Sequence, residues 1–262
     1  QKELEKIKSD VTKTKKELDE LKNKTDEKKN KINQILLEIP NLVDDKVPVG
    51  KSEIDNIIIK EVGKINKPDF KIKNHVEILE KNNLLDYNKA SKLSGSRFSV
   101  LRSSLATLHR ALVNFMIDIN VTEFQYEECI VPELVKSDCL TGTGQLPKFD
   151  EDLFRTNFND LWLIPTAEVP LTNFHREEII DSTKLPLRYT SFTNCFRSEA
   201  GAAGKDTKGL MREHQFGKVE LVSIAEPNKS MAEMERMIEC VEMILNKLNI
   251  PYRLVELCSG DL

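Results

Sequence analysis

The sequence predicts an α+β protein, in which helices flank an antiparallel β-sheet and a long helical coiled-coil arm precedes it. Three observations support this fold class. Apolar residues recur every three or four positions through the first 39 residues, and four later segments have strand character. The loops between those segments are too short for the repeated crossover helices of a parallel sheet.

The arm is predicted over residues 1–39. The first 40 residues contain 11 Lys and 9 Asp or Glu but no aromatic residue and no glycine. A seam with alternating spacings of three and four is the heptad pattern of a coiled coil, here formed by Leu4, Ile7, Val11, Thr14, Leu18, Leu21, Thr25, Lys28, Ile32, Ile35 and Ile39. One helix cannot bury its own stripe, so we expect a partner helix from another chain or from a segment before Gln1. Pro40 ends the helix.

The elements after the arm follow from local patterns. Residues 41–97 are polar and mostly irregular, apart from an apolar run at 57–59 and a helix-like stretch at 75–92. Apolar residues at helical spacing predict a helix over 101–119, and an extended segment follows at 128–131. Strands are predicted at 161–164, 188–196, 215–224 and 252–258, with an amphipathic helix over 231–248.

Composition excludes several classes of protein. With 39% hydrophobic and 31% charged residues, the chain is neither a disordered nor a membrane protein. Five scattered cysteines without a C-x-x-C pair, and four histidines without ligand spacing, predict reduced thiols, a cytoplasmic location and no metal site. The net charge of −4 gives no indication of nucleic acid, but it averages a +2 arm with an acidic remainder.

Chemically useful residues concentrate at 196–220, where the predicted strands 188–196 and 215–224 are joined. This span holds four of the ten glycines (Gly201, Gly204, Gly209, Gly217) and five basic residues (Arg197, Lys205, Lys208, Arg212, Lys218). A glycine-rich basic loop between two strands suits an approach to phosphates and to a polynucleotide end. The alternative is an ordinary solvated hairpin, which needs neither the length nor the glycines.

Strand alternation predicts which of these side chains share a face. Residues two apart on a strand point the same way. We therefore expect Arg197 with Glu199 on one strand, Phe216 with Lys218 and Glu220 on the next, and Thr166 with Glu168 on an earlier one. An antiparallel pair of strands would bring the first two sets to one sheet face.

Several ordered segments resemble the bacterial type of seryl-tRNA synthetase, a family of class II aminoacyl-tRNA synthetases. Phe196-Arg197-x-Glu199, the basic loop and Arg212-x-His214-x-Phe216 are similar to motif 2 of that class. The other matching segments run in order through nearly the whole chain, at 39–42, 47–50, 93–98, 142–149, 164–173 and 195–201.

The resemblance implies a division into three parts. Residues 1–39 would be the second helix of a tRNA-binding coiled-coil arm, 40–97 a linker and the start of the catalytic domain, and 98–262 the class II catalytic domain. It also implies that the first arm helix precedes Gln1 and that motif 3 lies beyond Leu262. The chain is then incomplete at both ends and nearly inactive by itself.

The resemblance further implies activation of L-serine by ATP to seryl-adenylate, and its transfer to the 3′ end of tRNA(Ser). Arg197 and Arg212 would be catalytic through charge neutralisation and alignment. The serine site would consist of Thr166, Ala167, Glu168, Arg197 and Glu220, and the ATP site of Arg197, Ser198, Glu199, Arg212 and Phe216. Mg²⁺ is implied with ATP, and no residue of the chain is assigned to it.

Plainer interpretations stay open for single features. Arg212 can be a solvent-facing loop charge, and Glu220 can form an ion pair with Lys218 or Arg197. Residues 101–131 and Pro132 resemble motif 1, which implies a homodimer, but a core helix would have the same pattern.

Two other functions also remain as alternatives. One is a synthetase-like protein that activates an amino acid for a non-tRNA carrier, against which the arm counts. The other is a coiled-coil interaction protein, against which the site residues at 166–220 count.

Overall fold

The computed structural model describes residues 2–202 and 209–262, and the chain divides into two compact units. Unit 1 is Gln1–Leu42 and unit 2 is Val43–Leu262. Gly204, Lys205 and Lys208 of the predicted basic loop lie outside the described residues.

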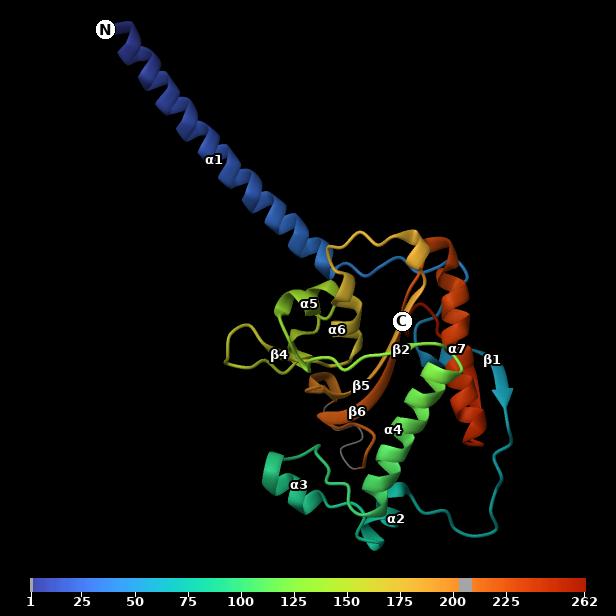
Figure 1. Ribbon diagram of the computed structural model, residues 1–262. Helices are drawn as coiled ribbons and strands as arrows, with labels where there is room; N and C mark the ends of the chain where they lie inside the picture. The colour runs from blue at the N-terminus through green and yellow to red at the C-terminus, as the bar shows by residue number, and fades with distance from the viewer. Residues whose placement is uncertain (1, 203–208) are drawn as a thin grey trace. The chain divides into compact units, whose positions relative to one another are not determined.

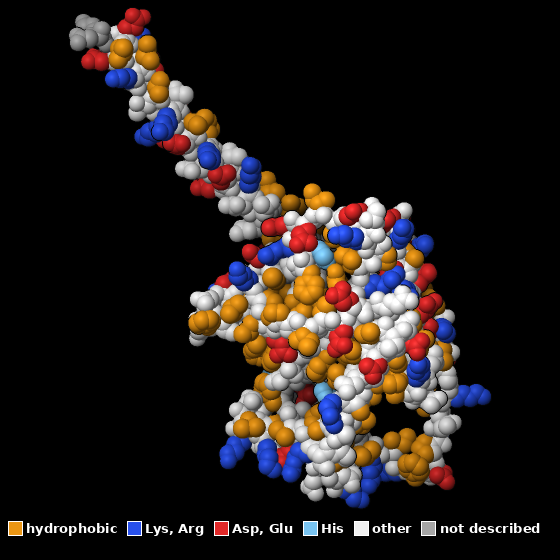
Figure 2. Space-filling view, in the orientation of Figure 1, with side chains coloured by type: hydrophobic (Ala, Val, Ile, Leu, Met, Phe, Trp, Pro, Cys, Tyr) orange, Lys and Arg blue, Asp and Glu red, His pale blue; other side chains and the backbone are white. Residues whose placement is uncertain are grey.

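Unit 1 consists mainly of one long helix, α1 (Lys2–Glu38), which confirms the predicted arm helix. Basic and acidic side chains alternate along it, with apolar side chains between them (Figure 2). The seam is open to solvent, since Leu18 is 63% and Leu21 64% exposed. A helix with an uncovered apolar stripe fits one half of a coiled coil.

The principal sheet of unit 2 has the strand order β2-β5-β6. β5 (Leu187–Phe196) and β6 (Gln215–Ile224) pair antiparallel over ten residues each, as predicted. The short β2 (Glu127–Glu128) joins the other edge of β5 in parallel. The remaining strands form two antiparallel pairs, which are β1 (Ile57–Val62) with β7 (Tyr252–Glu256) and β3 (Leu134–Val135) with β4 (Trp162–Leu163).

Two helices cover one face of this sheet. α4 (Ser104–Thr122) and α7 (Ser230–Lys247) lie side by side next to β5 and β6 (Figure 1). Leu221 of β6 packs with them in a core built on Ile119 and Cys240. Both helices match the predicted segments to within three residues, because their apolar positions face this core.

The opposite face of the sheet packs on α6 (Glu168–Thr172). Val222, the neighbour of Leu221, belongs to this second core together with Leu171 and Tyr189. A third core surrounds Leu140 of α5 (Ser137–Gly142) and Trp162 of β4. The even-numbered residues of β6 thus face α6, which decides where the candidate site forms.

The helix-like stretch predicted at 75–92 is helical, and it consists of two short helices. α2 (His75–Lys81) begins with a capping box, in which the Asn74 side chain accepts from the backbone N–H of Glu77 at 2.9 Å. α3 (Tyr87–Ser94) begins anew because the Asp86 carboxylate accepts from the N–H of Lys89 at 2.9 Å. Short 3₁₀ turns occur at Glu53–Asp55, Asp150–Asp152, Asn173–His175, Ser182–Lys184, Ala200–Ala202 and Pro227–Lys229.

The start and the end of unit 2 are joined next to the β1–β7 pair. We call this contact, between residues 48–56 and 258–261, the clasp. The Ser259 N–H donates to the Pro48 carbonyl at 2.8 Å, and the Asn56 amide donates to the Asp261 carboxylate at 2.7 Å. A Cβ on Gly260 would lie 2.6 Å from the Lys51 carbonyl carbon, so only glycine fits there.

Two further predictions from the composition concern the cysteines and membrane spans. All five cysteines are free thiols, and Cys195, Cys240 and Cys258 are buried. Among the described residues, none of the helices combines the length and the apolar character that a membrane span requires.

Candidate active site

A cavity of about 380 Å³ opens on the α6 side of the sheet. It is lined by Gln145, Phe149, Asp152, Leu153, Pro165, Thr166, Glu168, Arg197, Glu199 and Lys218. Four of the nine predicted site residues, Thr166, Glu168, Arg197 and Glu199, are among them. The cavity therefore unites side chains that lie up to 73 positions apart in the sequence.

Lys218 and Glu220 form a charged pair beside the cavity. They lie two apart on β6, as predicted, and the Lys218 ammonium is 2.5 Å from a Glu220 carboxylate oxygen. Lys218 also donates to the Thr166 hydroxyl at 3.1 Å, and that hydroxyl donates to the same Glu220 oxygen. The ion pair with Lys218, which was the plainer interpretation of Glu220, is thus present. Both contacts use one carboxylate oxygen, so the second can accept from a ligand.

Thr166 and Glu168 do not share a strand face, so this part of the prediction is wrong. β4 ends at Leu163, and Glu168 is the first residue of α6. The chain turns here, and the Glu168 N–H donates to the Thr166 hydroxyl at 3.2 Å. Both side chains still line the cavity, whereas Ala167 between them is fully buried in the core.

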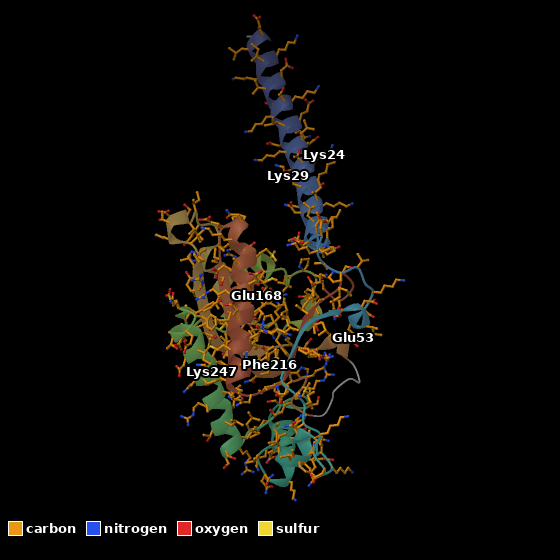
Figure 3. The ribbon with its side chains drawn as sticks, turned by 90° about the vertical axis from the view of Figure 1, so that its right-hand side faces the viewer. Lys24, Lys29, Glu53, Glu168, Phe216 and Lys247 are labelled. Atoms are coloured by element: carbon orange, nitrogen blue, oxygen red, sulfur yellow. The ribbon has the colours of Figure 1, made fainter. Side chains whose placement is uncertain are left out.

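Glu168, which is labelled in Figure 3, has both acidic and basic neighbours. Partial burial in the cavity wall raises the pKa of its carboxyl group, and the nearby charge of Glu220 raises it further. Lys218 and Arg197 act in the opposite direction but do not cancel the shift. A bound cation would relieve this unfavourable environment, because an opposite charge stabilises the ionised carboxylate.

Arg197 and Glu199 lie just beyond the end of β5, so their expected strand geometry is also wrong. β5 ends at Phe196, and Glu199 has a left-handed backbone with a φ of 53°. The Arg197 Nε donates to the Pro165 carbonyl at 3.3 Å, and its guanidinium carbon lies 5.3 Å from the centre of the Phe216 ring. These contacts hold the guanidinium between the cavity wall and an aromatic ring.

Arg212 does not line the cavity but reaches it through Glu199. Its Nη1 donates to one Glu199 carboxylate oxygen at 3.0 Å. Ser198 likewise points elsewhere, because its hydroxyl donates to the Glu151 carbonyl. The predicted ATP residues are therefore neighbours in space, although only Arg197 and Glu199 face the cavity directly.

The sequence prediction missed Asp152, which braces the start of the loop. Its carboxylate accepts from the Ala200 N–H at 2.9 Å, and its carbonyl accepts from the Ser198 N–H at 2.9 Å. Gln145 and Phe149 of the cavity wall were missed as site residues too. They belong to the segment 142–149, whose resemblance to the family was the available signal.

Comparison with known proteins decides the family. Residues 148–262 match the tRNA synthetase class II core domain (G, H, P, S and T). The serine–tRNA ligase of Caldicellulosiruptor saccharolyticus is 52% identical over 229 residues, which are 87% of this chain and 54% of that protein. The chain belongs to the seryl-tRNA synthetase family. It spans about half the length of the curated relatives that it matches.

Solved structures of seryl-tRNA synthetases have the same fold. The Pyrococcus horikoshii enzyme complexed with ATP gives a TM-score of 0.88 at 39% identity, over 93% of this chain and 59% of that one. The cytoplasmic serine–tRNA ligase of Naegleria fowleri in complex with AMP gives 0.84 at 33% identity, over 92% and 57%. The α+β class and the resemblance to this family are thereby confirmed.

Proposed function

We propose that the protein containing this chain is a serine–tRNA ligase, which uses ATP to activate L-serine and transfers it to the 3′ end of tRNA(Ser). The observation that carries the proposal is the cavity in which Glu168, the Thr166–Lys218–Glu220 cluster and the Arg197 guanidinium meet. The two carboxylates can bind the ammonium and the hydroxyl group of serine. The fixed guanidinium can bind two anions at once, namely the serine carboxylate and a phosphate of the nucleotide.

In this proposal the serine site consists of Thr166, Ala167, Glu168, Arg197 and Glu220. Glu168 pairs with the serine ammonium, which would lower the raised pKa of its carboxyl group. Glu220 accepts from the serine hydroxyl through the oxygen that Thr166 and Lys218 do not occupy. Alanine has no hydroxyl and would leave that oxygen unpaired, so the site discriminates against alanine as a substrate.

The ATP site consists of Arg197, Ser198, Glu199, Arg212 and Phe216. Phe216 stacks on the adenine ring, and Glu199 accepts from the adenine amino group through the oxygen that Arg212 does not hold. Arg212 holds the terminal phosphates. The ATP and AMP bound by the two structural neighbours support a nucleotide site in this fold.

The first chemical step joins two anions. A serine carboxylate oxygen attacks the α-phosphorus, the bond from phosphorus to the bridging oxygen breaks, and pyrophosphate leaves. In the second step a hydroxyl of the terminal tRNA ribose attacks the seryl carbonyl carbon, and AMP leaves. Arg197 neutralises and aligns the reacting groups, and no protein nucleophile is needed. Cys195 fits this account, because it is fully buried and burial raises the pKa of its thiol.

The proposal extends to the other expected partners. Exposed apolar side chains next to Pro132, with Ile130 97% and Leu134 42% exposed, support a homodimer through the motif 1 region. The open seam and the lysines of α1 support an arm that binds tRNA, and the five free thiols support a cytoplasmic location.

Mg²⁺ is expected together with ATP, and the proposal assigns no residue of this chain to it. Mg²⁺ usually binds through one or two carboxylates together with substrate phosphates. The part of the chain that is described contains no group of three His, Cys, Asp or Glu side chains placed to hold a metal ion.

Amino-acid-dependent exchange of pyrophosphate into ATP tests the proposal, with serine, threonine and alanine as substrates of the full-length protein. We expect exchange with serine alone. Glu220→Gln should lower kcat/KM for serine by about tenfold, since a charged hydrogen bond becomes a neutral one. Absence of serine-dependent exchange would refute the proposal, and exchange without charging of tRNA would favour activation for a non-tRNA carrier.

A further inference from the structure

We propose that His214 and Arg97 are positioning residues, which lock both limbs of the loop that carries Arg197 and Glu199. Neither residue lines the cavity, so each would act through the groups that do. The test of this inference by enzyme activity rests on the proposed function, whereas its test by amide hydrogen exchange does not.

The first part of the lock replaces a rung of the β5–β6 ladder. The last regular pair is Phe196 with Gln215, and Arg197 with His214 comes next. The Arg197 N–H donates to the His214 carbonyl at 3.0 Å, as in a ladder. The return bond comes from the ring, because His214 Nδ1 lies 2.9 Å from the Arg197 carbonyl oxygen. Both backbone polar groups of Arg197 are therefore held by one residue.

The ring of His214 is itself fixed in orientation. A carbonyl oxygen can only accept, so Nδ1 carries the hydrogen in this contact. The ring centre lies 5.4 Å from that of Phe98 and 5.8 Å from that of Phe154. These two rings come from different segments and hold the imidazole in the plane that the hydrogen bond requires.

The second part of the lock is Arg97, from the segment before α4. Because the His214 ring supplies the return bond, the His214 N–H is available to donate to the Arg97 carbonyl at 2.8 Å. The Arg97 Nη1 donates to the Glu199 carbonyl at 3.2 Å. Arg97 thus contacts the limb that enters the loop and the limb that leaves it. Its left-handed backbone, with a φ of 59°, is consistent with a residue held by its surroundings.

The consequence concerns the direction of the Arg197 side chain. Its backbone is fixed by His214, and its guanidinium is fixed by the Pro165 carbonyl and the Phe216 ring. If the backbone shifts, the guanidinium must leave one of these contacts. Because the proposed role of Arg197 depends on alignment with two anions, such a shift acts on the chemical step.

Two substitutions of His214 separate the hydrogen bond from the aromatic packing. The amide nitrogen of His214→Asn can take the place of Nδ1, whereas His214→Leu cannot donate. In pyrophosphate exchange we expect His214→Leu to lower kcat by about 10- to 100-fold, with KM for ATP near the wild-type value. His214→Asn should recover most of the loss, although it lacks the aromatic ring as well.

His175→Leu is the matched control. His175 also makes two side-chain contacts, at 2.9 Å to Glu178 and 2.9 Å to the Tyr189 hydroxyl, but it lies outside the cavity wall. We expect it to change thermal stability and to leave exchange unchanged. If His214→Leu has wild-type kcat, or if the Asn and Leu variants are equally impaired, the inference is wrong.

Arg97→Gly tests the other half of the lock. Glycine accepts the left-handed backbone, so this variant removes the guanidinium without straining the Arg97 carbonyl contact. We expect it to lower kcat as well, by about tenfold. Wild-type exchange by Arg97→Gly would exclude the guanidinium from the lock.

Amide hydrogen exchange gives a readout that does not require catalysis. In the wild type the Arg197 N–H should exchange slowly, and His214→Leu should accelerate exchange at 197–199 while His214→Asn does not. Unchanged protection in the Leu variant would refute the lock even if the wild type activates serine. If the wild type shows no pyrophosphate exchange, the proposed function fails, and the protection data still decide the lock.

Discussion

Among single residues, Glu168 of the proposed serine site carries a carboxyl group whose ionised form is disfavoured in the folded state. Burial and the charge of Glu220 raise the pKa of its carboxyl group above the ordinary value. A raised pKa means that the folded protein binds the proton more tightly than the unfolded chain does. Ionised Glu168 therefore destabilises the fold at neutral pH, and this penalty disappears as the pH falls through the raised pKa.

Glu168→Gln should consequently stabilise the protein while it weakens serine binding. We expect a higher free energy of unfolding than wild type at pH 7, and a difference that shrinks as the pH falls toward the usual pKa of glutamate. Urea unfolding between pH 4 and pH 8 would measure it, with the exposed Glu235→Gln of α7 as the control. A variant no more stable than wild type at pH 7 would contradict this expectation.

Individual site residues also show what the sequence patterns could and could not predict. Phe216, Lys218 and Glu220 were placed on one face correctly, because β6 is long and regular. Thr166 and Glu168 were placed on a strand, but the chain turns into α6 between them. The prediction that both side chains belong to one site agrees with the cavity wall, but the strand geometry on which it was based is absent. Asp152 was missed because its role depends on contacts with a loop 48 residues away.

Helices and strands with a periodic pattern of their own were predicted, whereas those that depend on distant residues were not. α4, α7, β5 and β6 have their own periodic patterns, and all four were predicted. β1 appeared only as a short apolar run, because its strand partner is β7, about 190 residues later. Between α2 and α3 the backbone of Asn83 is left-handed, with a φ of 54°, and the Asp86 carboxylate caps the start of α3. A periodicity argument weighs neither feature.

The clasp makes a prediction for Gly260. Gly260→Ala would place a Cβ against backbone atoms of Gly50 and Lys51, at 2.7 and 2.6 Å. Because backbone atoms move less readily than side chains, we expect a loss of about 2 kcal/mol in the free energy of unfolding. Amide exchange along β1 should also become faster.

Gly201→Ala is the matched control for this substitution, because a Cβ there would meet nothing within 4 Å. Its free energy of unfolding should stay near that of the wild type. Equal stability of the two alanine variants would show that the clasp tolerates the extra carbon.

For the whole molecule, the two units predict a separation of functions. Lys24 and Lys29 of α1 lie off the apolar seam, and Figure 3 marks both. If the arm binds tRNA as proposed, replacing the two with glutamate should raise KM for tRNA by about tenfold and make charging less salt-dependent, because fewer phosphates are neutralised. Serine-dependent pyrophosphate exchange, which needs only unit 2 residues in our proposal, should not change.

Lys247→Glu on α7 is the control for a charge reversal within unit 2. It should leave KM for tRNA near the wild-type value. If the Lys24 and Lys29 variant charges tRNA like the wild type, α1 does not contribute to tRNA binding through these side chains.

The pairing of β1 with β7 also has a consequence for biosynthesis. β1 leaves the ribosome about 190 residues before its partner is made. At a synthesis rate of 5–20 residues per second, that interval lasts about 10–40 s. During it the isoleucines 57–59 belong to a strand without a neighbour, which is a hazard for association between nascent chains. Lys60 and Glu61, next in the strand, place charges where such association would begin.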